Sequence, residues 1–173
     1  DSGGNNSLYE IDTINGEVIR TVEITNTTNN DWEDITTDSE YIYIGDFGNN
    51  YGNRQDLVIY KVSISDYLNT SDNTVVAEQI NFSYSDQTTF QSNPYNSNFD
   101  AESIISFNDS LYIFTKNWVD NKSNVYSLTK NVGTYIASKV DSLDVQGLIT
   151  AAEYNHTSNT VTLLGYNSDS NFV

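Results

Sequence analysis

The sequence predicts an all-β fold, and composition and periodicity carry this prediction. The apolar residues are largely aromatic and β-branched, with 13 tyrosines and 7 phenylalanines among 173 residues, and such residues suit pleated, half-buried strands. No segment shows the sustained 3.6-residue periodicity of a helix. We expect at most a short helical turn near residues 66–68. An internal repeat then predicts how the strands are arranged.

Three segments repeat one pattern, which consists of an acidic residue, a short strand, a polar turn and an apolar strand. They cover residues 32–45, 101–115 and 152–165. A third and a fourth strand follow each of the first two copies. These strands are expected at residues 56–62 and 75–82, and at residues 123–128 and 134–140.

The start of the chain repeats the pattern of a third and a fourth strand, at residues 7–12 and 18–24. The dipeptide Asn15-Gly16 between them is favoured in β-hairpin turns. Residues after 147 supply only a first and a second strand. The chain therefore reads as a half unit, two full units and another half unit.

Repeated units of four antiparallel strands are typical of the blades of a β-propeller. We expect a single propeller segment of about three blades, with a half blade at 1–30, blades at 31–98 and 99–146, and a half blade at 147–173. Closed propellers have about four or more blades, so we expect that these residues alone do not close the ring. A β-sandwich is the competing all-β fold, but it would not place an acidic residue before the first strand of each unit.

A calcium site is the sharpest functional expectation. In a four-stranded meander the first strand begins, and the second ends, at the same end of the unit. Glu33, Glu102 and Glu153 begin equivalent inner strands and should converge near the propeller axis, where oxygen ligands suit Ca²⁺. The candidate ligands are Glu33, Asp34, Asp46, Asn49, Asp100, Glu102 and Glu153. A water-filled channel without a metal is the alternative.

The same end of the units carries aromatic and basic residues that could bind a partner protein or a glycan. They are Trp32, Tyr51, Arg54 and Trp118. Packing of the aromatic rings between blades is the alternative role. The chain has no cysteine and a single histidine, His156 in a predicted turn, which excludes disulfides, thiolate zinc sites and histidine dyads. We assign no catalytic residue.

The net charge of −17 argues against partners that are themselves anionic. Such a charge repels phosphate backbones and anionic lipid headgroups, so we expect nucleic acid and membrane surfaces to be poor partners. No apolar run approaches the length of a membrane span, so we expect no membrane insertion. The sequence is rich in Asn, Ser, Thr and Tyr and poor in Lys, which favours an extracellular or cell-surface location.

Several motifs resemble a group of uncharacterised secreted bacterial β-propeller proteins. They lie at residues 31–35, 41–50 and 59–61, at Arg54, and at residues 99–102. More distantly, the chain resembles propellers of the paraoxonase, SdiA-regulated and esterase-like phytase type, several of which hold calcium in the channel. The resemblance implies a secreted propeller and a calcium site. The histidine pair of the paraoxonases has no counterpart in this sequence.

Two functions remain open. The first is a binding or interaction module for a protein or glycan partner, with Ca²⁺ as the candidate stabilising ion. The alternative is a calcium-dependent hydrolase of phosphate esters or lactones. A hydrolase of that kind needs cationic groups beside the metal. Only Arg54 and Lys116 are candidates on that face, which favours binding.

Overall fold

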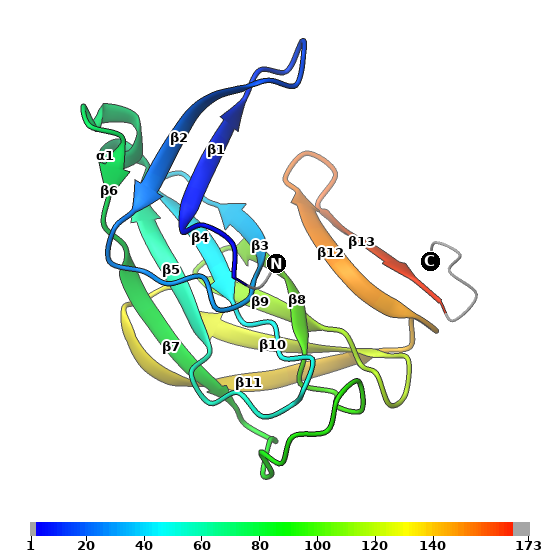
Figure 1. Cartoon of the computed structure of the whole chain (residues 1–173). Helices are drawn as coiled ribbons and strands as arrows, with labels where there is room; N and C mark the ends of the chain where they lie inside the picture. The colour runs from blue at the N-terminus through cyan, green and yellow to red at the C-terminus, as the bar shows by residue number, and fades with distance from the viewer. Residues whose placement is uncertain (1–2, 168–173) are drawn as a thin grey trace.

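The computed structural model describes residues 3–167, and it confirms the all-β fold. Eight strands form one sheet built from two four-stranded meanders (Figure 1). The first meander contains β3 (Trp32–Thr37), β4 (Tyr41–Asp46), β5 (Val58–Ser63) and β7 (Glu78–Tyr84). The second contains β8 (Ala101–Phe107), β9 (Ser110–Thr115), β10 (Ser123–Thr129) and β11 (Gly133–Leu143).

Smaller elements lie outside this sheet. One three-stranded sheet contains β1 (Ser7–Ile11), β2 (Val18–Ile24) and β6 (Thr74–Val75), and one hairpin contains β12 (Leu148–Asn155) and β13 (Thr160–Tyr166). The helix α1 (Ile64–Asn69) is a short one, as expected. It begins where the Ser63 hydroxyl accepts a hydrogen bond of 3.2 Å from the Asp66 N–H, which is the usual role of an N-cap serine. None of the described helices is long and apolar enough to span a membrane.

Strands β4 and β5 of the first meander are buried on both faces, because alternate side chains enter two different clusters. On β4, Tyr43 packs into the core shared with the second meander. Its neighbours Ile42 and Ile44 pack on the opposite face with Val22 and Ile24 of β2. The β1–β2 hairpin therefore covers the first meander.

The hairpin β12–β13 covers the second meander in the same way. Ile149 of β12 joins a cluster with Ile105 of β8, Phe114 of β9 and Val125 of β10. The core between the two meanders contains buried aromatic residues from both, including Phe82 and Tyr126. Each meander thus packs against the other through a common core, and a hairpin covers each one.

Strand pairing departs from the expected purely antiparallel pattern at two places. Strand β7 pairs with β11 in parallel, with Ile80 opposite Gly133 and Tyr84 opposite Ala137. Strand β2 also pairs in parallel with β6. Both meanders start at the same end, so their fourth strands run in the same direction and must pair in parallel where their edges meet. This junction makes one continuous sheet of the two meanders.

The sheet curves until its two end strands, β3 and β8, lie beside each other, which gives a nearly closed, barrel-like shape (Figure 1). No backbone ladder joins β3 to β8 among the described pairings. Side chains of β3 bond to the backbone of β8 instead. The Ile104 N–H donates to Asp34 Oδ2 at 2.8 Å, and the Ser106 N–H donates to Thr36 Oγ1 at 3.3 Å.

Candidate functional site

Three loops meet at the end of the two meanders where the first strands begin, and buried polar side chains hold them in place. Asp46, at the end of β4, is fully buried. Its two carboxylate oxygens accept hydrogen bonds from the N–H groups of Asp31 at 3.0 Å and Asn30 at 3.1 Å. Asp46 also forms an ion pair of 3.0 Å with Arg54. The oxygens of this expected calcium ligand are thus already bonded within the protein.

Arg54 lies inside the loop after β4 rather than on an open surface. Its Nη1 donates to the Gly48 carbonyl at 2.9 Å, and its Nε bonds to Asp56 at 3.0 Å. Only 16% of its side chain is exposed. This geometry gives the expected partner-binding arginine a role in fixing the loop.

Asp100 and Asn49 connect the loop after β4 to the segment that precedes β8. The fully buried Asp100 accepts hydrogen bonds from the Asn49 N–H at 2.5 Å and from Trp118 Nε1 at 2.7 Å. The Asn49 amide donates to the Phe99 carbonyl and accepts from the Arg54 N–H. Burial raises the pKa of Asp100, while these hydrogen bonds act in the opposite direction. Both residues therefore connect loops.

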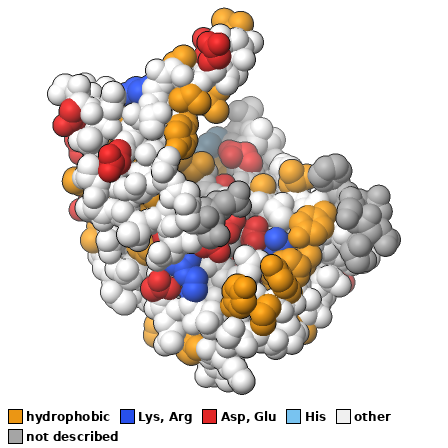
Figure 2. Space-filling view, viewed as in Figure 1, with side chains coloured by type: hydrophobic (Ala, Val, Ile, Leu, Met, Phe, Trp, Pro, Cys, Tyr) orange, Lys and Arg blue, Asp and Glu red, His pale blue; other side chains and the backbone are white. Residues whose placement is uncertain are grey.

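Carboxyl groups from β3 and β8 come together beside these loops. Figure 2 shows acidic and basic side chains gathered near the middle of one face. Burial, together with the charges of Glu102 and Asp31, raises the pKa of Glu33 to about 8. Burial raises the pKa of Glu102 to about 7, although Lys116 Nζ lies 3.1 Å from its Oε1 and opposes the shift. Gly48 faces this acidic cluster, and a Cβ there would overlap the Glu33 and Asp31 carboxylates.

The expected seven-residue calcium set does not form one group. Asp34 spans the β3–β8 seam, and Glu153 on β12 is exposed. Burial raises the pKa of Asp34 to about 6, with a further contribution from the charge of Glu153. Within residues 3–167 no group of three or more His, Cys, Asp or Glu side chains is arranged to hold a metal ion. Within the expected set, Glu33, Asp100 and Glu102 influence one another's charge, and Glu153 influences Asp34 separately.

The aromatic residues that we expected to bind a partner do not form one surface either. Trp32 packs against Tyr60 with ring centroids 5.9 Å apart, and its Nε1 donates to the Thr28 carbonyl. Trp118 bonds to Asp100 and meets Tyr95 edge-on at 5.0 Å. Tyr51 alone of the expected aromatic residues is exposed, at 53%. It stands at the rim of a cleft.

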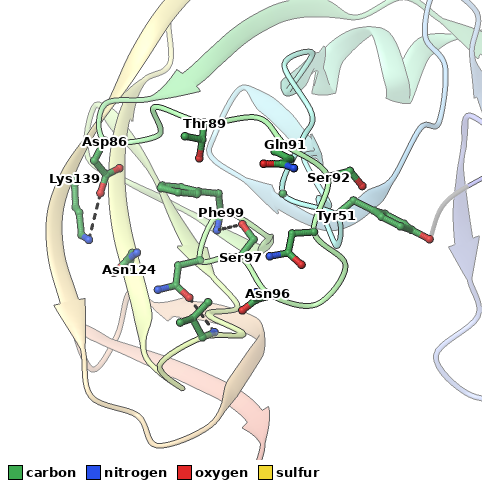
Figure 3. A pocket seen from close by; sticks show the side chains of 14 residues that line it. Tyr51, Asp86, Thr89, Gln91, Ser92, Asn96, Ser97, Phe99, Asn124 and Lys139 are labelled. Carbon is green, nitrogen blue, oxygen red and sulfur yellow. Dashed lines mark hydrogen bonds and ion pairs between the residues drawn. The ribbon is translucent and has the colours of Figure 1, made fainter.

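This cleft, of about 670 Å³, is the feature that the sequence reasoning missed (Figure 3). Its volume lies within the range of about 300–1,000 Å³ that is typical of small-molecule sites. The long loop between β7 and β8 forms much of its wall, with further residues from the loop after β4, from β10 and from β11. The unusual length and the polar composition of residues 83–98 were the signal that could have indicated it.

Comparisons of this chain with family models, with curated proteins and with solved structures gave no match.

Proposed function

We propose that this chain is a segment of a β-propeller that acts as a secreted or cell-surface binding module. Two consecutive four-stranded antiparallel units, at residues 31–98 and 99–146, support the assignment of blades. The covering hairpins β1–β2 and β12–β13 correspond to the outer and inner halves of further blades. The binding face is the end of these units where the long loops meet.

The observation that carries this proposal is the cleft and the way its walls are held. Asn49 and Asp100 are buried and bond to the backbone of other loops, and the N–H groups of Asn93 and Tyr95 donate to the carbonyls of Tyr51 and Asn50. A loop held by several internal hydrogen bonds loses little conformational entropy when a ligand binds. A preformed cleft with polar walls is therefore suited to recognising a ligand of defined shape.

Binding is favoured over hydrolysis because Arg54 and Lys116, the two cations expected to stand beside a metal, are already paired. Arg54 bonds to Asp46 and Asp56, and Lys116 bonds to Glu102. A hydrolase of phosphate esters needs free positive charge to stabilise the charge that develops on the transferred group. Because these cations are paired, they supply little free positive charge for that purpose.

Ligand-induced change in tryptophan fluorescence tests the proposal. Trp118 precedes Val119, which lines the cleft, and a Trp32→Phe variant makes Trp118 the single tryptophan reporter. We expect saturable fluorescence changes with a ligand from a panel of neutral and charged oligosaccharides and of peptides. We expect no turnover of p-nitrophenyl phosphate or of a lactone in the presence of Ca²⁺. Turnover, or no response to any compound, would overturn the binding proposal.

The calcium site that we propose has fewer ligands than the sequence predicted. The side-chain oxygens of Asp46, Asn49 and Asp100 already accept hydrogen bonds within the protein, and Glu102 is paired with Lys116. The carboxyl groups of Asp31 and Glu33 form no hydrogen bond or ion pair with other described residues, and both lie against Gly48. We propose that a cation, if it stabilises the protein, does so through these two groups.

A further inference from the structure

The cleft is close to electrically neutral, although the chain as a whole carries a net charge of −17. Its charged lining residues are Asp86 and Lys139, which form an ion pair of 3.4 Å along one wall. Asp86 also accepts a hydrogen bond of 2.9 Å from the Tyr126 hydroxyl. Since both charges are compensated, the site offers little attraction to an ionic ligand.

The opposite wall carries polar side chains without protein partners. Gln91, Ser92 and Asn96 lie in the loop before β8, and none of their side chains bonds to another described residue. Figure 3 shows these three residues on one side of the cleft, with Asp86 and Lys139 across from them. An amide offers both donors and acceptors, and a hydroxyl does the same. This combination matches the closely spaced hydroxyl groups of a sugar.

Phe99 supplies an apolar surface between these walls. It is half-buried, and its ring packs against Tyr84 with centroids 5.5 Å apart. Its backbone is held at both sides, because its N–H donates to Ser97 Oγ and its carbonyl accepts from the Asn49 amide, each at 3.1 Å. An immobile aromatic ring can pack against the C–H face of a pyranose at a low cost in entropy.

We propose that this cleft binds a neutral oligosaccharide, with Phe99 against one sugar ring and with Gln91 and Asn96 bonding its hydroxyls. This inference rests on the proposed binding function and names the ligand class. We infer a neutral ligand because the charges in the cleft are compensated. We infer a sugar because unpaired side-chain amides lie beside an immobile aromatic ring.

Isothermal titration with hexasaccharides of glucose, xylose and N-acetylglucosamine tests the inference, and an oligogalacturonate serves as the anionic comparison. We expect at least one neutral hexasaccharide to bind more tightly than the anionic one. Gln91→Ala and Asn96→Ala should each weaken that binding about tenfold, because each removes about 1.4 kcal/mol of interaction. Both side chains are exposed, so the variants should keep their folding stability. Gln79→Ala, at an exposed position on β7, is the matched control and should bind as the wild type does.

Two results would overturn the sugar assignment. One is that no neutral hexasaccharide binds, and the other is that binding is unaffected by both cleft variants. If a peptide of the panel binds instead and the cleft variants weaken it, the sugar assignment fails while the proposed binding function stands. If neither class binds, the proposed function fails as well.

Discussion

Individual carboxylates in this protein have different roles, which depend on the groups that surround them. Asp46 and Asp100 are fully buried and accept hydrogen bonds from loop N–H groups. Glu33 is partly buried without such donors, so burial and neighbouring charges raise its pKa. Asp56 is largely exposed, and it bonds to Arg54 and accepts a hydrogen bond from the Asn30 amide. These contrasts allow matched substitutions.

Replacing Asp46 should destabilise the fold strongly, whereas replacing Asp56 should not. Both contact Arg54 at 3.0 Å, but the Asp46 side chain is 0% exposed and that of Asp56 is 62% exposed. Asp46→Ala removes the buried ion-pair partner of Arg54, which keeps only the exposed Asp56, and leaves two N–H groups without their acceptor, so we expect a loss of about 3–5 kcal/mol. Asp56→Ala should cost less than about 1 kcal/mol. Urea unfolding measures both, and equal losses would contradict the assigned role of Asp46.

Glu33→Gln should make the protein more stable at alkaline pH. The pKa of Glu33 is raised from 4.5 to about 8 in the folded protein, so its contribution to stability is full below pH 4.5 and is lost as the pH rises through about 8. Because the group is partly solvated, we expect the variant to gain only about 1–2 kcal/mol over the wild type above that range. Near pH 4.5 the two proteins should match.

Urea unfolding across this pH range provides the measurement. Some pH dependence should persist in the variant, because burial raises the pKa of Asp34 and of Glu102 as well. A variant no more stable than the wild type at alkaline pH would show that the Glu33 carboxyl is well solvated.

At the scale of elements, the sequence predicted the strands well because their pattern is local. Alternation of apolar residues and polar turns placed β2 at residues 18–24 and β4 within one residue of its end. The parallel junction of β7 with β11 was not predictable in this way. It depends on how two distant strand edges meet, and period-2 patterning carries no information on the partner of an edge.

The same limit applies to the candidate site. A carboxylate that binds a cation and one that accepts loop N–H groups look alike in a sequence. The grouping of Glu33 with Glu102 followed from the repeat, and the two charges do influence each other. The role of Asp34 did not follow, because its partner is the backbone of Ile104, 70 residues away. Backbone donors leave no signature in the amino-acid sequence.

The seam between β3 and β8 should depend on the Asp34 side chain. Asp34→Ala removes the acceptor of the buried Ile104 N–H, and an unpaired buried donor costs about 1–3 kcal/mol. Asp141→Ala on β11 is the control, since Asp141, like Asp34, accepts a bond from the following N–H but is exposed. We expect the Ile104 amide to exchange with deuterium faster in Asp34→Ala only. Unchanged exchange at Ile104 would mean that β3 and β8 are held without this bond.

At the scale of the whole molecule, repulsion among acidic groups opposes folding. The chain has 24 acidic and 7 basic residues, and a large net charge destabilises the compact state. Any salt that screens this charge should therefore raise the melting temperature. A specific effect of calcium must be separated from this general one.

Calcium should raise the melting temperature beyond what NaCl of the same ionic strength achieves, if Asp31 and Glu33 hold a cation. Binding at about a hundred times the dissociation constant adds about 2.7 kcal/mol, and each kcal/mol raises the melting temperature of a domain of this size by about 2–4 °C. Glu33→Gln should abolish the excess while keeping the response to NaCl. Glu102→Gln is a poorer test, because it also leaves Lys116 without its partner at 3.1 Å. Thermal unfolding after chelation, with Mg²⁺ as a second comparison, measures the excess. Identical curves in CaCl₂ and in matched NaCl would show that the acidic cluster is only solvated and that the calcium proposal is wrong.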